Sequence, residues 1–287
     1  ELTHKVYNQL KLEGNKFSNE SLRLEHDIRS IVYKQEQTGF YIDQSKAMSL
    51  SARLEDKAEQ LEKEVHKTFP PIKREEEFIP KVNNKSRGYI KGQPFTKVTY
   101  EEFNLASRKQ IAERLMMLGW KPLKFTDKNS PIVDEGVLSK IEDIPEAKLI
   151  SEYLLLKKRT SQISSWLDEV KHTTGRVHGR VLTLRCVSGR MSHHSPNMAQ
   201  VPATYSPYGK ECRQVWTTDK PDTHVIFGTD ASGLELRMLA HYINTPEYTN
   251  EILNGDIHTK NMNMAGLNDR DQAKTFIYAF LFGAGSK

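Results

Sequence analysis

The sequence predicts an α/β protein of the α+β type, in which a helical first part precedes a part that mixes strands with helices. Apolar residues recur at helical spacing over most of residues 21–170. After residue 175 the pattern changes to short alternating or apolar runs bounded by glycine, which is typical of strands. Helical spacing then returns over 234–242 and 270–281. Helices first and mixed structure later indicate two architectural units.

The helical part begins with the stretch 21–69, which is interrupted at 37–43 by a turn and a short extended piece. Phe69-Pro70-Pro71 ends its second helix, because proline cannot continue a helix. Residues 70–104 are rich in Pro, Gly, Asn and Lys and lack clear periodicity. They predict an irregular excursion with one hairpin.

Two further helices are expected over 107–118, where Ser107 can cap, and over 146–170. Strands are expected over 175–184 and over 224–229, the second of which ends at Asp230.

The last predicted helix, 270–281, has Asp269 as its candidate cap, and Gln272 three residues later completes a capping box.

Composition excludes several classes of protein. The chain has 287 residues, of which 37% are hydrophobic and 28% charged, as in an ordinary globular protein. It contains no apolar run of the roughly 18 residues that a membrane helix needs. The first residues resemble no signal peptide, and Cys186 and Cys212 are too few for a disulfide framework or a four-ligand zinc site. A reduced, cytoplasmic setting is therefore expected, without membrane partners.

The net charge of +5 is concentrated in one stretch. Residues 171–218 contain seven lysines and arginines and a single acid, Glu211, among histidines and aromatic residues. An ordinary solvated surface intersperses both signs. The stretch therefore indicates a surface for a polyanion such as nucleic acid, with a plain basic loop region as the alternative.

Asp230 is the first candidate for chemistry. A carboxylate at the end of a strand is rigidly held and reaches solvent, which suits a hard divalent cation. The alternative is that Asp230 caps the helix that follows. Glu235, five residues on, either faces the same cleft or is a surface residue.

The predicted helix 270–281 carries Arg270, Lys274 and Tyr278 at i, i+4 and i+8, so the three share one face. Two cations and a ring on one stripe could hold a triphosphate and stack on a base. The alternative is an ordinary amphipathic helix. The opposite side is expected to pack through Phe276, Ile277, Phe280 and Leu281.

Four segments, in this order along the chain, resemble motifs of family A (DNA polymerase I-type) DNA polymerases. Their residues are most similar to those of the short-tailed phage branch. The resemblance runs from about residue 20 to the last residue. The segments are Ser188–Ser192 with Pro196–Pro202 (primer-template motif), Asp230–Arg237 (motif A), Gly255–Thr259 (start of the fingers) and Arg270–Gly283 (motif B).

The resemblance implies residue roles in template-directed DNA synthesis. Asp230 would bind two Mg²⁺ ions with the Ala231 carbonyl. The implied catalytic residues are Asp230, Lys274, Arg270 and His258. The implied nucleotide-binding residues are Glu235 (which would exclude a 2′-hydroxyl), Arg270, Lys274, Tyr278, His258 and Phe282. The residues implied to touch primer-template DNA are Arg190, Asn197, Gln200 and Arg213.

The implied architecture is a polymerase right hand with a helical thumb, part of the palm sheet and the first fingers helices. The boundaries are 1–24 for the tail of an exonuclease domain, 25–168 for the thumb, 169–242 for the first part of the palm and 243–287 for the first part of the fingers. The implied partners are primer-template DNA and dNTPs, in the host cytoplasm if the chain is phage-encoded.

Two parts of the family pattern are missing, namely the exonuclease and a later His-Asp-Glu motif with the second catalytic carboxylate. We therefore expect this chain to be the front portion of a polymerase, completed by a second polypeptide, with the exonuclease on a further one. Because the excursion 70–104 is short, no thioredoxin-type processivity factor is expected there.

Two other functions stay open. A non-catalytic DNA-binding subunit could retain the polymerase fold. A single-subunit RNA polymerase shares the palm plan, but Glu235 argues against it because a ribonucleotide enzyme needs room for the 2′-hydroxyl.

Overall fold

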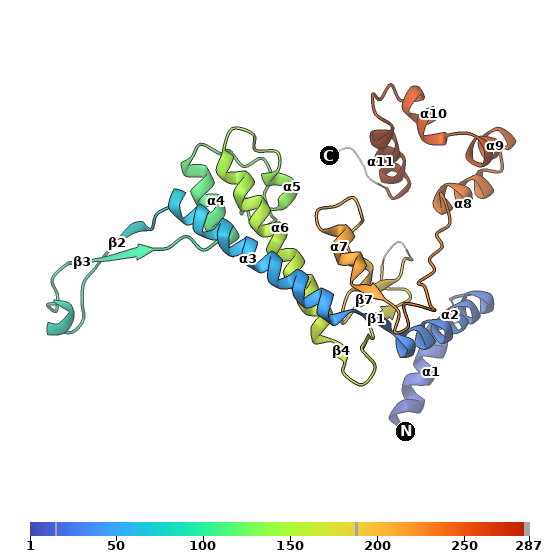
Figure 1. The fold of residues 1–287 in the computed structure, drawn as a ribbon, viewed down its shortest axis with the longest axis horizontal. Coiled ribbons are helices and arrows are strands. Elements are labelled where there is room, and N and C mark those ends of the chain that lie inside the picture. The colour runs from blue at the N-terminus through green and yellow to red at the C-terminus, as the bar shows by residue number, and fades with distance from the viewer. Residues whose placement is uncertain (15, 187–188, 284–287) are drawn as a thin grey trace. The chain divides into compact units, whose positions relative to one another are not determined.

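The computed structural model describes residues 1–14, 16–186 and 189–283, and these form two compact units (Figure 1). Unit 1 comprises residues 1–181 and 193–223, and unit 2 comprises 182–192 and 224–287. Ser188 of the primer-template motif and the last four residues of the expected fingers lie outside the described residues. Among the described residues, no helix is both long and apolar enough to span a membrane.

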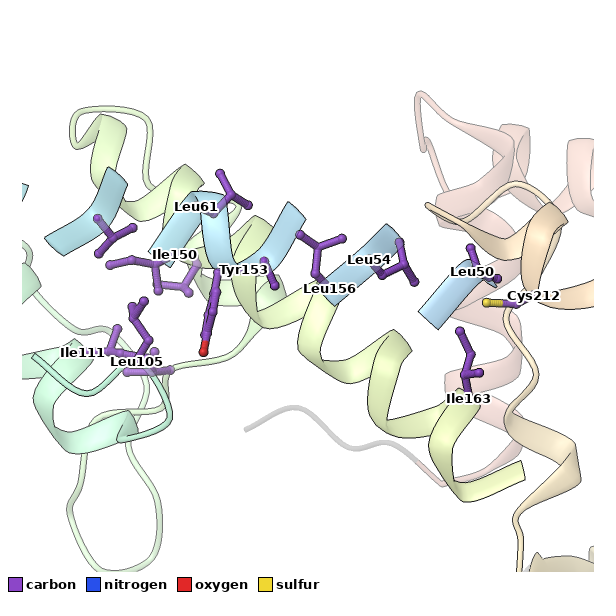
Figure 2. Packing of buried hydrophobic residues seen from close by; sticks show 14 of the residues in the cluster. Leu50, Leu54, Leu61, Leu105, Ile111, Ile150, Tyr153, Leu156, Ile163 and Cys212 are labelled. Atoms are coloured by element: carbon purple, nitrogen blue, oxygen red, sulfur yellow. The ribbon is translucent and has the colours of Figure 1, made fainter. Parts of the chain in front are cut away.

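Unit 1 is organised around two long helices, α3 (Gln44–Thr68) and α6 (Pro145–Asp168), which pack along each other (Figure 2). Asp43 caps α3 by accepting a hydrogen bond from the Lys46 amide, and Pro145 occupies the first turn of α6, where its missing N–H costs nothing. The buried side chains between them include Leu54, Leu61, Ile150, Tyr153, Leu156 and Ile163. Helical spacing in the sequence thus predicted the main core correctly.

Shorter helices complete the helical part of unit 1. They are α1 (Leu2–Gly14), α2 (Asn19–Thr38), α4 (Arg108–Met117), α5 (Glu135–Leu138) and α7 (Gly209–Gln214), with 3₁₀ turns at Lys85–Arg87 (η1) and Met198–Gln200 (η2). The predicted cap of α4 is confirmed, because the Ser107 hydroxyl accepts a hydrogen bond from the Gln110 amide. The helix α5 has a single turn, too short for periodicity to reveal it.

A small antiparallel sheet follows the order β4-β5-β1-β8. Its strands are β4 (Val170–Lys171), β5 (Arg176–Val177), β1 (Phe40–Ile42) and β8 (Trp216–Thr217). The expected strand 175–184 is corrected to two, because β6 (Arg180–Leu182) leaves this sheet and pairs with β7 (Ser192–His194). Gly179 lies between the two strands, and a Cβ there would meet the Met198 side chain at 2.6 Å, so the backbone approaches Met198 closely at this position.

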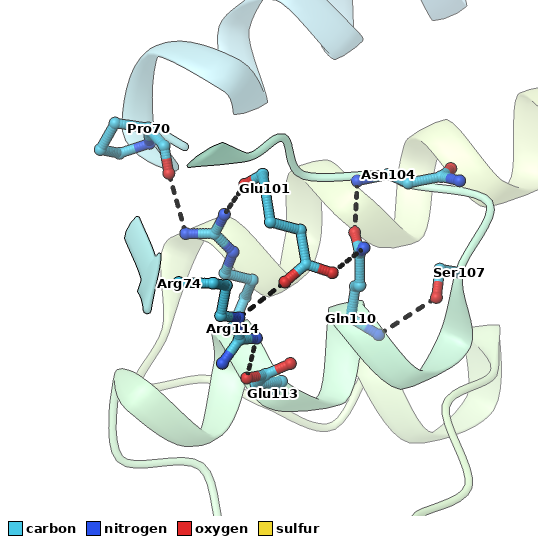
Figure 3. Close-up of polar contacts among 8 residues, drawn as sticks. All are labelled: Pro70, Arg74, Glu101, Asn104, Ser107, Gln110, Glu113 and Arg114. Atoms are coloured by element: carbon cyan, nitrogen blue, oxygen red, sulfur yellow. Dashed lines mark hydrogen bonds and ion pairs between the residues drawn. The ribbon is translucent and has the colours of Figure 1, made fainter. Parts of the chain in front are cut away.

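The excursion 70–104 contains a regular hairpin of β2 (Ile72–Phe78) and β3 (Phe95–Glu101), paired along all seven residues of each strand. Its base is tied to α4 (Figure 3). The buried Arg114 donates to the Pro70 carbonyl at 2.9 Å, and Arg74 pairs with Glu101 at 2.8 Å and with Glu113. The predicted hairpin is therefore confirmed, but it is more regular than expected.

Unit 2 contains α8 (Leu234–Ile243), α9 (Pro246–Asn254), α10 (Ile257–Met264) and α11 (Arg270–Leu281). The helices expected over 234–242 and 270–281 are confirmed. The expected strand 224–229 is wrong, because this segment has no regular secondary structure and Val225 and Phe227 are each 86% exposed. A strand needs a paired neighbour, and no strand among the described residues pairs with it.

Candidate functional site

The best-formed polar cluster of unit 2 lies where α10 and α11 contact each other. Asp256 caps α10 by accepting hydrogen bonds from the amides of His258 (3.2 Å) and Thr259 (3.4 Å) and from the Thr259 hydroxyl (2.8 Å). The same carboxylate receives Nε and Nη2 of Arg270, at the start of α11, at 2.9 and 3.0 Å. This bidentate pair, followed by the Thr259 hydrogen bond, holds the pKa of Asp256 well below its usual range.

His258, which is half-buried, experiences the charges of both members of this pair. Burial lowers the pKa of its imidazole, and the positive charge of Arg270 lowers it further, so the ring is neutral at neutral pH. Its Nδ1 and the Nδ2 of Asn261 are buried without a hydrogen-bond partner in the described part of the chain.

The predicted stripe on α11 faces this cluster. The Tyr278 ring lies 6.3 Å from the His258 ring, and burial, followed by the negative charge of Glu235, raises the pKa of the Tyr278 hydroxyl. The Lys274 charge acts on His258, and Lys274 has no ion pair among the residues the structure describes. The charge of Arg270 is compensated by Asp256, whereas that of Lys274 is not.

The opposite side of α11 does not pack as expected. Phe276 is 54% and Phe280 67% exposed, while Ala273 is the buried residue of the helix. The physical reason is that the described helix packed against α11 is α10, and α10 takes the polar face. The prediction of a packed apolar side is therefore wrong for Phe276 and Phe280, whereas Ile277 and Leu281 are half-buried in the part of the chain described.

Glu235 forms an ion pair with Arg190, a cation that does not belong to the α10–α11 cluster. It lies in the first turn of α8, where its pKa is lowered first by its own backbone amide and then by the guanidinium of Arg190, with which it forms an ion pair. The same guanidinium stacks over the Phe282 ring at 5.1 Å. The resemblance implies that Arg190 contacts DNA and that Glu235 and Phe282 bind the nucleotide. In this structure the Arg190 side chain contacts both Glu235 and Phe282.

Asp230 stands apart from these contacts. It is exposed and lies in the irregular segment before α8, whose N-cap position is Gly233, with φ of 60°. The alternative interpretation, in which Asp230 caps that helix, is therefore wrong. No group of three or more His, Cys, Asp or Glu side chains that could hold a metal ion occurs among the described residues. Asp230 and the Ala231 carbonyl alone do not fit a site for two Mg²⁺ ions, which take about six oxygen ligands each.

The remaining DNA-contact candidates belong to unit 1. Asn197 accepts a hydrogen bond from the Ala199 amide at 3.1 Å, the Gln200 carbonyl accepts one from Gln162 at 3.1 Å, and Arg213 donates to the Pro202 carbonyl at 2.8 Å. The basic stretch 171–218 is thus divided between the two units.

Among the polar residues of the cluster, Thr259, Asn261 and above all Asp256 were assigned no role from the sequence. The signal was present, because an Asp followed three residues later by Thr259 at the start of a helix is a capping pattern. Its pairing with Arg270, 14 residues away, depends on how α10 and α11 meet, and helical periodicity does not encode that.

Comparison with known proteins identifies the class. A solved structure described as the POL domain of Pol1 from M. smegmatis in complex with DNA primer-template and dNTP matches 91% of this chain and 42% of that chain, with a TM-score of 0.68 and 15% identity. The fold is therefore that of a polymerase domain.

The family follows from sequence. The model of DNA polymerase family A matches residues 79–287, and the chain belongs to this family. The DNA-directed DNA polymerases of Enterobacteria phage T3 and Escherichia phage T7 are each 46% identical to it over 222 residues, with 70% of this chain and 31% of the relative covered. The match thus spans about a third of the length of these phage relatives.

Proposed function

We propose that this chain is the front portion of a template-directed DNA polymerase. In the reaction, the 3′-hydroxyl of a primer loses its proton to solvent, its oxygen bonds to the α-phosphorus of a dNTP, and the bond from that phosphorus to pyrophosphate breaks. The observation that carries the proposal is the α10–α11 cluster, which gathers two cations, a neutral imidazole and an aromatic ring within one unit. Membership of family A supports the same reaction.

In this proposal the cluster holds the incoming nucleotide. Lys274 and Arg270 bind the triphosphate, and neutral His258 assists there as a hydrogen-bond donor. Tyr278 packs beside the sugar and the first base pair, and the resemblance to family A implies that a Tyr at this place goes with ready acceptance of dideoxynucleotides. Phosphoryl transfer asks a protein mainly for positioning and charge neutralisation, which these side chains can supply.

Sugar selection is assigned to Glu235, whose carboxylate would lie under the sugar and exclude a 2′-hydroxyl. Its ion pair with Arg190 fixes the carboxylate, and the Phe282 ring stacks on the same guanidinium. The primer-template DNA would be contacted through the minor groove, which tolerates any sequence. The residues proposed for that contact are Arg190, Asn197, Gln200 and Arg213.

Three features support completion by a second polypeptide. The segment Val225–Thr229 is apolar and unpaired, the Phe276 and Phe280 side of α11 is uncovered by the described residues, and Asp230 has no neighbouring acidic cluster there. A further carboxylate from the completing polypeptide would supply the charge that two Mg²⁺ ions require. A strand from it would pair with 225–229.

The proposed domain assignment keeps the boundaries expected from the sequence. They are an exonuclease tail at 1–24, thumb at 25–168, palm at 169–242 and fingers at 243–287. No thioredoxin-type factor is proposed at 70–104, and the proposed setting is the host cytoplasm.

The first test is native mass spectrometry of the isolated material with and without primer-template DNA. A mass equal to this chain plus a further polypeptide supports the proposal, and primer extension is then measured on that assembly. Lys274→Ala should reduce incorporation by about 10²–10³-fold while duplex binding changes little. Lys260→Ala, which removes the same charge from α10, is the matched control. Equal activity of the two variants would refute the assignment of Lys274.

A non-catalytic DNA-binding subunit is the second candidate, favoured by the isolated carboxylate of Asp230. It predicts that Asp230→Ala leaves every activity of the assembly unchanged, whereas the polymerase proposal predicts loss of primer extension at retained DNA binding. Preferred incorporation of ribonucleotides would instead indicate an RNA polymerase.

A further inference from the structure

The end of the β2–β3 hairpin, residues 79–94, carries charge of one sign. This hairpin tip contains the cations Lys81, Lys85, Arg87 and Lys91 and no acidic residue. All four side chains are exposed. The tip belongs to unit 1 and lies far along the sequence from the basic stretch 171–218, so it forms a separate concentration of positive charge.

The tip has a defined conformation. The Asn84 side chain caps η1 by accepting from the Arg87 amide at 3.2 Å, and Asn83 accepts from the Lys91 amide at 2.7 Å. Beneath the tip, Phe78, Tyr89 and Phe95 form an edge-to-face cluster with ring centroids 4.6–5.9 Å apart. Such a small aromatic core fixes the backbone on which the cations stand.

In the stem of the hairpin, by contrast, cations form ion pairs with acidic side chains. Lys73 pairs with Glu75, and Arg74 pairs with Glu101 and Glu113, so cations and acids compensate one another there. In the part of the chain that the structure describes, none of the four tip cations forms an ion pair. The stem is anchored to α4 (Figure 3), so the uncompensated charges are presented on a fixed arm.

We propose that the hairpin tip binds the phosphate backbone of duplex DNA, an inference that rests on the proposed polymerase function. Four exposed cations without internal partners match a polymer that carries one negative charge per about 1.7 Å of helix axis. Phosphate contacts are independent of base sequence, as replication requires. The hairpin would thus increase the affinity of the chain for DNA through contacts that lie outside the proposed nucleotide site.

The test compares two variants of the whole chain that each lose four positive charges. The tip variant carries Lys81→Gln, Lys85→Gln, Arg87→Gln and Lys91→Gln. The control carries Lys121→Gln, Lys124→Gln, Lys128→Gln and Lys140→Gln, exposed lysines of the same unit that form no ion pair in the described residues. Binding to a fluorescein-labelled 24-base-pair duplex is measured by anisotropy between 50 and 200 mM KCl, and tryptophan fluorescence confirms that both variants fold.

The tip variant should bind at least about tenfold more weakly than the control at 100 mM KCl. Its slope of log Kd against log salt should fall by about 2 to 4, since each lost phosphate contact removes about 0.9. Equal binding and equal slopes in the two variants would overturn the inference and leave the proposed function intact. A wild-type chain that binds no duplex would overturn both. Tip-dependent binding of polyglutamate without tip-dependent DNA binding would assign the surface to an acidic protein and overturn the inference.

Discussion

Leu156 offers the most direct test of how unit 1 is held together. Its side chain is fully buried between α3 and α6 (Figure 2), where the neighbouring apolar side chains belong to two long helices that cannot collapse onto a gap without bending. Leu156→Ala should therefore lower the free energy of unfolding by about 3 kcal/mol, within the usual range of ~2.7–5 kcal/mol for a buried leucine.

The assay follows from the positions of the tryptophans. The chain has three, Trp120, Trp166 and Trp216, and all lie in unit 1, with the rings of Trp166 and Trp216 5.2 Å apart. Tryptophan fluorescence during urea unfolding thus reports this unit alone. With a slope of about 2 kcal/mol per molar urea, the midpoint should fall by about 1.5 M.

The control is Leu123→Ala, because Leu123 is 92% exposed and its removal should change stability by less than about 0.5 kcal/mol. If Leu156→Ala shifts the midpoint by no more than this control, with the slope unchanged, then packing of α3 against α6 does not hold unit 1 together and the reasoning fails.

Three further predictions use other sites. The His258 imidazole should titrate below 6.5 in NMR spectra of its ring, since burial lowers its pKa; its neutral form therefore stabilises the fold fully above pH 6.5, and that stability is lost as the pH falls through the lowered value. A midpoint at or above 6.5 would contradict the burial of this ring. Gly39→Ala should destabilise unit 1 by about 1–3 kcal/mol, because Gly39 has φ of 63° and a Cβ would lie 2.7 Å from the Val177 carbonyl oxygen; Gly14→Ala, with no atom within 4 Å, is the control, and equal melting temperatures would refute the argument. The Glu36 carboxylate has a pKa lowered from 4.5, chiefly by its hydrogen bonds from Arg29, so its contribution should be complete above pH 4.5 and lost as the pH falls further. Glu36→Gln should flatten the acid limb of the stability profile, and an unchanged limb would count against the pair.

The helices were predictable because each carries its own signal. The spacing of apolar residues and the caps at Ser107 and Asp269 are local properties, and the structure has α4 and α11 beginning directly after those residues. The stripe Arg270, Lys274 and Tyr278 was predictable for the same reason, since a regular helix fixes which residues share a face.

The failures share a physical cause, which is that they depend on what packs against a segment. Val225–Thr229 has the composition of a strand, but a strand exists only with a partner, and none of the described strands pairs with it. Phe276 and Phe280 have the spacing of a packed face, yet α10 contacts the other side of their helix. The partnership of Arg190 with Glu235 joins segments 45 residues apart and leaves no local trace in the sequence.

The pair of Arg270 and Asp256 makes the two cations of α11 act over different ranges. A bound pair of opposite charges is a dipole, whose field decays faster with distance than that of a single charge. An anion in solution therefore experiences Lys274 first, as a monopole that attracts from several ångströms away. Arg270, whose Nε and Nη2 are already committed to Asp256, offers its remaining N–H groups in a fixed plane and acts at hydrogen-bonding distance. In the proposed nucleotide site, long-range capture and short-range orientation of the triphosphate would thus be divided between two residues one helical turn apart.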